Sequence, residues 1–197
     1  MIGRLPTRLA LLGLASLLLA CPGRGGDDDD STLDPNFDAA MLPQGPNPPH
    51  APMQAEVMSI TDGDTGRFRL SDGDQRNVRF LSIDTPEMNA GNSDPPECYA
   101  QESTDRTEEL LPVGTKVWLT WDGEYQDGFD RLLSYIFVGE TPDVTSYDNW
   151  VNLKLVQEGY GRAFIFSNNQ TYRTLFEDSE QDARDADLGR WSECGFR

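Results

Sequence analysis

The stretch VRFLSIDTPE at residues 78–87 decides how this chain is organised. Its apolar run is typical of a buried strand, which leads into a tight Asp-Thr-Pro-Glu ending. Arg79 lies near the start of the run, and Asp84 and Glu87 lie at its end. Because charged side chains are seldom buried without partners, this grouping suits phosphate and metal chemistry better than packing. The rest of the chain is expected to build a sheet around this strand.

Five strands are predicted from short apolar or alternating runs that are bounded by turn residues. They span Ala55–Thr61, Gly66–Leu70, Asn77–Ile83, Lys116–Trp121 and Arg131–Val138. The sequence Ser-Asp-Gly-Asp at residues 71–74 is typical of a hairpin turn between the second and third strands. A polar loop, residues 122–130, separates the last two strands.

Three helices are predicted between and after these strands. They span Glu97–Leu111, Trp150–Glu158 and Thr171–Leu188, and a short extended piece covers Arg162–Phe166. Glycine follows the second and third helices, as is common at helix ends. Together these elements predict an α+β fold, a five-stranded OB-fold-like β-barrel with three packed helices. An open antiparallel sheet beneath the helices is the alternative.

The first twenty residues are typical of an export signal peptide. Arg4 and Arg8 give a positive start, and the largely apolar segment Leu9–Leu19, eleven residues long, is too short to span a bilayer. The sequence Leu-Leu-Ala-Cys that ends at Cys21 resembles a bacterial lipobox, which implies cleavage before Cys21 and attachment of lipid to its sulfur. We therefore expect an exported protein, lipid-anchored to a membrane of the cell envelope, with the outer membrane and the cell surface both open. An ordinary secreted protein without lipid is the alternative.

Residues 21–52 are predicted to form an acidic tether rich in proline and glycine. They include Gly-Arg-Gly-Gly, the four aspartates Asp27–Asp30 and repeated prolines up to Pro52. Few of these groups suit a core, so disorder is expected. The single histidine, His50, falls in this range and is given no metal role. Residues 53–197 then form one domain of ordinary size, and we expect it to be a monomer.

The charge of the chain is strongly acidic. Six of the 34 acidic and three of the 16 basic residues lie in residues 1–50, so the remainder holds 28 acidic and 13 basic residues, a net charge of −15. This balance argues against generic binding of nucleic acid. Eleven of the 13 basic residues are arginines, and four of them, Arg67, Arg69, Arg76 and Arg79, lie on the second and third strands. A local arginine patch on an acidic body can still hold a short stretch of phosphate backbone.

The chain has three cysteines, Cys21, Cys98 and Cys194. If Cys21 carries lipid, the other two remain, and in an oxidising export compartment two remaining cysteines favour a disulfide. It would join the first helix to the C-terminal tail across a loop of roughly 100 residues, which the chain-entropy model values at about 4–5 kcal/mol. Two buried free thiols are the alternative.

The sequence Asp-Gly-Asp occurs at residues 62–64 and again at 72–74. An isolated Asp-Gly-Asp is usually a turn, and that interpretation is kept for the second occurrence. The first occurrence is interpreted differently because the chain also holds other candidate site residues that would accompany it, namely Arg79, Asp84, Thr85, Glu87 and Arg131.

The order of DGDT (62–65), VRFLSIDTPE (78–87) and DGFDRLLSYIF (127–137) resembles the thermonuclease, or staphylococcal-nuclease-like, family. The resemblance continues through VNLKLVQEGYGRA (151–163) and LGRW (188–191), and covers roughly residues 55–192. It implies the barrel with three helices and a Ca²⁺-dependent nuclease that hydrolyses phosphodiester bonds of DNA and RNA.

The resemblance also implies a role for each residue of the group. Asp64 and Asp84 would be carboxylate ligands of Ca²⁺ and Thr85 would offer its backbone carbonyl, a set of hard oxygen donors that suits this ion. Glu87 would be the general base, or would orient the attacking water. Arg79 and Arg131 would grip the phosphate, because a guanidinium donates two parallel hydrogen bonds. The alternative for these charged side chains is a surface ion-pair network.

Further substrate contacts are predicted at Arg67, Arg69, Phe164 and Phe166. The two phenylalanines stand where the family has substrate-stacking tyrosines, and stacking on a base survives that change. They could equally belong to the core. A second departure is Asp130, which replaces the usual glycine before Arg131 and could pair with that arginine.

Two other function classes remain open. One is a catalytically weak module that binds an oligonucleotide or a protein on the same barrel, and the other is an acidic lipoprotein that binds Ca²⁺ structurally. The presence of Arg79, Glu87 and Arg131 favours the nuclease, because a binding module needs no general base.

Overall fold

The computed structural model describes residues 36–89 and 95–195. The predicted signal peptide at residues 1–20 and the lipidation site Cys21 lie outside these residues. Within the part of the chain that is described, no helix is long and apolar enough to cross a membrane.

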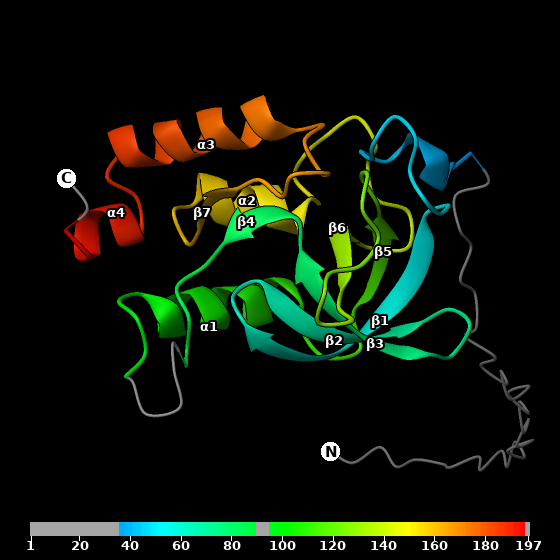
Figure 1. Cartoon of the computed structure of the whole chain (residues 1–197), viewed down its shortest axis with the longest axis horizontal. Coiled ribbons are helices and arrows are strands. Elements are labelled where there is room, and N and C mark those ends of the chain that lie inside the picture. The colour runs from blue at the N-terminus through cyan, green and yellow to red at the C-terminus, as the bar shows by residue number, and fades with distance from the viewer. Residues whose placement is uncertain (1–35, 90–94, 196–197) are drawn as a thin grey trace, which may run out of the picture. The chain divides into compact units, whose positions relative to one another are not determined.

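A closed five-stranded barrel forms one half of the domain (Figure 1). Its strands are β1 (Met53–Asp62), β2 (Thr65–Leu70), β3 (Gln75–Phe80), β5 (Lys116–Thr120) and β6 (Leu132–Val138). Their order is β1-β2-β3-β6-β5, and β1 closes the barrel on β5. The β3–β6 pair is parallel and all other pairs are antiparallel. The predicted α+β fold with a five-stranded barrel is thus confirmed, and the open sheet is excluded.

Apolar residues at alternate strand positions fill the barrel. Val57, Phe68, Val78 and Leu119 are fully buried there, and each lies on a different strand. Alternate side chains of a strand point to opposite faces, so these residues point inward together. Fully burying one such side chain stabilises the fold by about 1.5–3 kcal/mol.

The predicted third strand, Asn77–Ile83, is in fact two strands. β3 ends at Phe80, and β4 (Ser82–Asp84) leaves the barrel and pairs with β7 (Arg162–Phe164) in a separate two-stranded sheet. Ser82 has a φ of 64°, a left-handed conformation that turns the chain between the two strands. Leu81 and Ile83 are buried on either side of this turn, so the apolar run continues and hides the break.

The buried side chain of Asn152 occupies the space that the break opens. Its amide nitrogen donates to the carbonyls of Leu81 and Ser134, each at 3.0 Å, and its oxygen accepts from the Ile136 N–H at 2.8 Å. A buried backbone polar group without a partner is costly, so this one amide makes the strand change tolerable.

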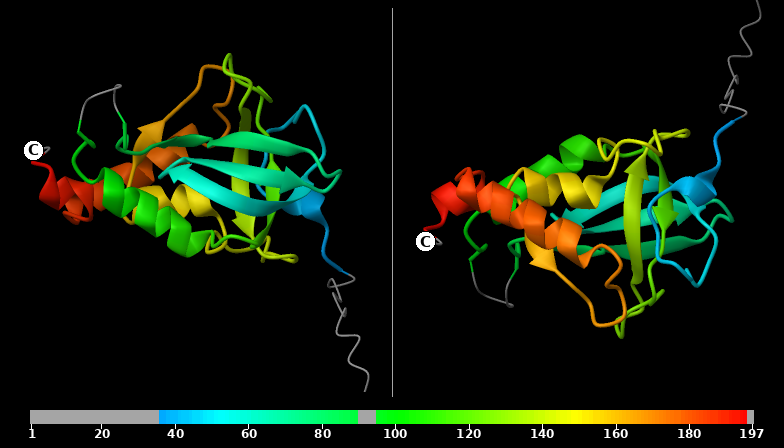
Figure 2. Two further views of the ribbon diagram at one scale, coloured as in Figure 1. Left: turned by 90° about the horizontal axis from the view of Figure 1, so that it is seen from below. Right: turned by 90° about the horizontal axis from the view of Figure 1, so that it is seen from above.

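The helices gather at one side of the barrel (Figures 1 and 2). They are α1 (Ala100–Leu110), α2 (Val151–Gln157), α3 (Arg173–Asp185) and the short α4 (Arg190–Glu193). β4 and β7 lie between α1 and α3 (Figure 1). The three predicted helices are present within the predicted ranges. The additional α4 restarts the chain after Gly189, whose φ is 54°, and buries Trp191.

Residues 36–52 were expected to belong to the tether, but they pack against the barrel. Leu42 is only 2% exposed, and the Thr120 hydroxyl donates to the Pro43 carbonyl at 2.6 Å. The indole N–H of Trp121 donates to the Ala51 carbonyl at 3.0 Å. The packed unit therefore extends upstream of residue 53. The sequence did not reveal this because backbone carbonyls, which every residue carries, make most of these contacts.

Candidate active site

The turn between β1 and β2 is held against the end of β4. A Cβ atom on Gly63 would lie 2.7–2.8 Å from the side chain of Thr85, so this position requires glycine. The hydroxyl of Thr107, on α1, donates to the Gly63 carbonyl at 2.7 Å. These two contacts bring the first Asp-Gly-Asp beside the Asp84-Thr85 segment, as the sequence predicted.

Asp64 follows Gly63 and is buried, with 1% exposure. Its Oδ2 accepts a hydrogen bond from the Thr85 N–H at 2.8 Å and faces the Arg79 guanidinium at 2.6 Å. Burial nevertheless raises the pKa of Asp64 to about 7, because the desolvation of its carboxylate outweighs the attraction of Arg79. The negative charge of Asp62 adds to this upward shift.

Arg79 bridges the two sequence segments that carry the aspartates. One of its terminal nitrogens faces Asp64, and the other donates to Asp84 Oδ1 at 3.0 Å. The side chains of Arg79 and Asp64 are 7% and 2% exposed, so their ion pair is shielded from water, whereas the Asp84 side chain is 25% exposed. The structure therefore brings together three of the predicted site residues, Asp64, Arg79 and Asp84.

Arg162 is a fourth member of this cluster, for which no role was predicted from the sequence. Its Nε and Nη2 donate to Asp84 Oδ2 at 3.0 and 2.8 Å. The contact follows from strand register, because Asp84 and Arg162 are direct partners across the β4–β7 pair. The sequence predicted an extended piece here but gave no sign of its pairing partner.

Glu87 lies just beyond the cluster and is exposed, whereas Thr85 and Pro86, which connect it to β4, are buried. Partial burial and the negative charges of Asp62 and Asp84 raise its pKa above the usual value, against the opposing effect of Arg79. A cavity of about 470 Å³ opens beside it. The cavity is lined by Asp84, Thr85, Glu87, Glu97, Cys98, Arg162 and Arg190.

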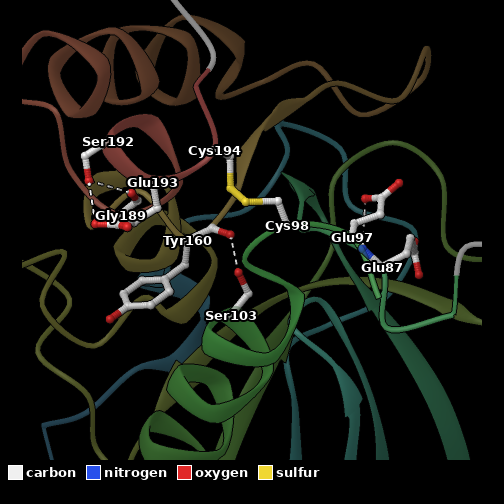
Figure 3. The surroundings of a disulfide bond; sticks show 9 residues. All are labelled: Glu87, Glu97, Cys98, Ser103, Tyr160, Gly189, Ser192, Glu193 and Cys194. Carbon is white, nitrogen blue, oxygen red and sulfur yellow. Dashed lines mark hydrogen bonds between the residues drawn. A yellow bond between two sulfur atoms is a disulfide. The ribbon is translucent and has the colours of Figure 1, made fainter. Parts of the chain in front are cut away.

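The two remaining cysteines meet beside this cavity. The sulfur atoms of Cys98 and Cys194 lie 2.06 Å apart, and the pair connects the start of α1 to the end of α4 (Figure 3). Figure 3 shows Glu87 and Glu97 on the chain that leads to Cys98. The disulfide between them stays a prediction.

Arg131, the second predicted phosphate ligand, pairs with Asp127, whereas Arg79 pairs with Asp64 and Asp84. Its Nε donates to Asp127 at 2.8 Å, and its guanidinium lies 5.6 Å from the ring of Phe129. Asp130 has a φ of 67°, which explains why glycine is usual at this position. The Asp130 carboxylate is directed to Arg76 and not, as considered from the sequence, to Arg131.

The four strand arginines lie on the paired strands β2 and β3, and each has polar partners of its own. Arg79 points into the site, whereas Arg76 pairs with Asp74 and Asp130. Arg67 donates to the side chains of Gln75 and Asn77, and Arg69 pairs with Glu56 at 3.3 Å. In the β2–β3 register Thr65 lies opposite Arg79 and Arg67 lies opposite Asn77, so alternation places Arg67, Arg69 and Arg79 on one face and Arg76 on the other.

The two candidate stacking residues lie close together, with ring centroids 5.1 Å apart. Phe164 is 39% exposed, whereas Phe166 is partly buried against the core. A third aromatic residue, Phe129, is 83% exposed, and the sequence analysis did not single it out. Its signal was its place in an acidic polar loop, where a large apolar side chain has no core to enter.

No three carboxylate, histidine or cysteine side chains converge on one point among residues 36–89 and 95–195 as a ready-made metal site. Asp64 and Asp84 lie close together, but their oxygens face guanidinium groups. The available donors are carboxylate and carbonyl oxygens, the kind that Ca²⁺ prefers.

Comparison with known proteins identifies the family of this chain. The family model described as staphylococcal nuclease homologue matches residues 77–193. The chain belongs to the staphylococcal nuclease family. Endonuclease YncB of Bacillus subtilis (strain 168) is 32% identical over 159 residues, which cover 75% of this chain and 68% of that protein. Thermonuclease of Staphylococcus intermedius is 32% identical over 135 residues, which cover 68% of this chain and 74% of that protein.

The segment that the family model matches begins just before Arg79 and includes Asp84, Glu87 and Arg162. The Asp-Gly-Asp at residues 62–64 lies upstream of it, and the fold brings the two together through Gly63 and Thr85.

Proposed function

We propose that this protein is a Ca²⁺-dependent nuclease that hydrolyses phosphodiester bonds of DNA, RNA or both. The observation that carries the proposal is the buried Asp64–Arg79–Asp84 cluster with Glu87 beside it. The relatives reported above are named as an endonuclease and a thermonuclease, which supports the same reaction class.

The charges of the cluster suit a divalent cation. Four carboxylates, Asp62, Asp64, Asp84 and Glu87, interact electrostatically, and Arg79 and Arg162 supply two positive charges. With all these groups ionised the sum is two negative charges. Asp64, Asp84 and the Thr85 carbonyl would hold Ca²⁺, which would supply positive charge next to a phosphate oxygen when bound.

Glu87 would take a proton from the attacking water. Its exposed carboxylate beside the cavity can reach a water molecule, and its raised pKa makes it a better proton acceptor than an ordinary glutamate. The buried guanidinium of Arg79, held by Asp64 and Asp84, would stabilise the negative charge that develops on the phosphate, because the low local dielectric strengthens its effect. Arg131 would add a second cation from the start of β6.

The cellular setting is also part of the proposal. We place the enzyme outside the cytoplasm, anchored in the bacterial cell envelope through lipid on Cys21, and acting as a monomer. The chemistry of the N-terminal sequence and the pairing of Cys98 with Cys194 support this setting, because disulfides persist in exported proteins.

A second candidate is a weak binding module on the same barrel. It is favoured by one observation, that guanidinium groups already occupy both oxygens of Asp84. If these ion pairs persist, the carboxylates are unavailable to a metal and hydrolysis is lost.

Digestion of single-stranded DNA and of RNA distinguishes these candidates. The nuclease should cleave at least one substrate in Ca²⁺ and stop when a chelator is added, and the lengths of the products separate internal from terminal cutting. The matched control is Asp84→Asn, which keeps the side-chain size but removes the charge. Binding without cleavage at saturating Ca²⁺ would establish the second candidate and exclude the first.

A further inference from the structure

Each carboxylate oxygen of Asp84 accepts hydrogen bonds from a different arginine, and the two arginines differ in their exposure to solvent. Arg79 donates to Oδ1 at 3.0 Å and is 7% exposed. Arg162 donates twice to Oδ2, at 3.0 and 2.8 Å, and is 51% exposed. The proposed mechanism uses Arg79 but has so far given Arg162 no part.

Arg79 is secured at several points. Besides Asp84, its guanidinium faces Asp64 at 2.6 Å and the backbone carbonyls of Asp64 and Phe80 at 3.5 Å. Moving it would leave buried groups without partners, which is costly. The two hydrogen bonds from the Arg162 guanidinium to Asp84, by contrast, both end on the one atom Oδ2. A half-exposed side chain of this kind can leave its partner for water or for another anion at little cost.

The space into which Arg162 can move is the cavity of about 470 Å³ beside Glu87. Arg162 and Asp84 both line it, so a small rotation of the Arg162 side chain shifts its charge from the carboxylate into the cavity. The backbone need not follow, because the β4–β7 register holds the two residues opposite each other.

We propose that Arg162 is a phosphate-binding residue, and that binding of Ca²⁺ to Asp84 releases it from its ion pair. While Asp84 carries no metal, Arg162 neutralises its Oδ2. When Asp84 becomes a metal ligand, the guanidinium is displaced and binds a non-bridging oxygen of the substrate backbone. This inference rests on the proposed function and adds that the binding of Ca²⁺ and the binding of nucleic acid are coupled.

Coupling between Ca²⁺ binding and nucleic-acid binding suits a strongly acidic protein. A free guanidinium offers a charge-assisted pair of hydrogen bonds to phosphate, and here it becomes available only when a divalent cation has compensated Asp84. Metal and nucleic acid then favour each other's binding, since each removes a competitor of the other, and such coupling is reciprocal.

Calorimetry of Ca²⁺ binding without nucleic acid tests the competition. Arg162→Gln should bind Ca²⁺ about two- to tenfold more tightly than the parent protein, because the competing ion pair is gone. The matched control is Arg173→Gln, which removes one positive charge at an arginine of similar exposure that pairs with Glu177 at 3.0 Å. The control should bind Ca²⁺ as the parent does. Equal affinity in the parent, Arg162→Gln and the control would overturn the inference, and so would weaker binding by Arg162→Gln.

Binding of a short single-stranded oligonucleotide with phosphorothioate linkages, measured at saturating Ca²⁺, tests the second half. Arg162→Gln should bind it about tenfold more weakly, as expected for loss of a charge-assisted contact, and Arg162→Lys should lie between. Unchanged affinity of Arg162→Gln for the oligonucleotide overturns the inference alone, provided that the parent binds Ca²⁺. If neither the parent nor Arg162→Gln binds Ca²⁺, the proposed function falls together with it.

Discussion

Glu87 and Glu97 hold each other across the loop that separates them. The backbone N–H of Glu87 donates to the Glu97 carboxylate at 3.0 Å, and the N–H of Glu97 donates to the Glu87 carbonyl at 3.0 Å. The next residue after Glu97 is Cys98, which contacts Cys194. The segment that carries the proposed base is thus tied to α1 and, through sulfur, to the C-terminal α4.

We expect Glu87→Gln to fold and to bind Ca²⁺ but to lose most of its turnover. The amide cannot accept the proton of the attacking water, and a general base contributes on the order of 10²- to 10⁴-fold. The measurement is kcat on single-stranded DNA at saturating Ca²⁺. Glu97→Gln serves as the control, because it keeps an oxygen that can accept from the Glu87 N–H. Parent-like turnover by Glu87→Gln would remove Glu87 from the role of base.

We expect the pairing of Cys98 with Cys194 to be a covalent disulfide in the exported protein. Mass spectrometry of alkylated, unreduced protein should detect one linked peptide pair. The double variant Cys98→Ser with Cys194→Ser should lose about 4–5 kcal/mol of unfolding free energy in the chain-entropy model, since the bond closes a loop of nearly 100 residues. Two alkylated thiols in protein isolated from the envelope would contradict the pairing.

The raised pKa of Asp64 predicts how stability depends on pH when Ca²⁺ is absent. The folded pKa of about 7 lies above the ordinary value of 3.8, so the folded state holds a proton that the unfolded state releases. That stabilisation is complete below pH 3.8 and is lost as pH rises through about 7. We therefore expect the free energy of unfolding of the parent to fall relative to Asp64→Asn between these pH values. A difference that grows with pH would instead mean that Arg79 lowers the pKa of Asp64.

The left-handed backbone of Asp130 predicts an order of stability for substitutions at that position. Asp130→Gly should be slightly more stable than the parent, because the left-handed region costs a residue with a Cβ about 1–2 kcal/mol, although Asp is among the better tolerated. Asp130→Ala keeps the Cβ and loses the side-chain contacts, so it should be less stable than the parent. Thermal unfolding measures both variants. Activity should stay unchanged in Asp130→Gly, because the carboxylate faces Arg76 and not Arg131. An alanine variant more stable than the glycine variant would contradict this explanation.

The acidity of the domain predicts an unusual response of activity to salt. At roughly 0.01 M salt the Debye length is about 30 Å and the whole acidic surface repels the approaching strand, whereas at 0.15 M it is about 8 Å. We therefore expect kcat/KM on single-stranded DNA to stay level or rise over this range, with Ca²⁺ saturating. At higher salt, competition at Arg79 and Arg131 should lower it. A steep fall from the lowest salt upward would show that the acidic residues lie too far from the site to matter.

The sequence predicted the barrel because its cues are local. Val57, Phe68 and Val78 lie in short alternating runs whose period of two marks a strand, and Asp-Gly turns separate the first strands. The charged residues at the strand ends, Asp64 and Asp84, could be placed for the same reason. Each lies next to a strand whose end could be located.

What the sequence could not predict depends on tertiary contacts. Arg162 reaches Asp84 through a strand pairing 78 residues distant, and no local pattern encodes register at that range. The left-handed Ser82 lies within an apolar run that continues through it. Leu42 is buried although the sequence Pro-Gln-Gly-Pro follows it, so its burial depends on the surface that the barrel presents.

The turn at Ser82 divides the candidate site between two packed bodies. Arg79 belongs to the barrel, whereas Asp84 and Arg162 belong to the small sheet that lies between the helices. The ion pair from Arg79 to Asp84 therefore spans the contact between the barrel and the helical layer, and its geometry depends on how these two layers pack together. A substitution in the contact between the two layers, far from any charged group, should therefore disturb this ion pair and abolish activity. The secondary structure of each layer should remain unchanged.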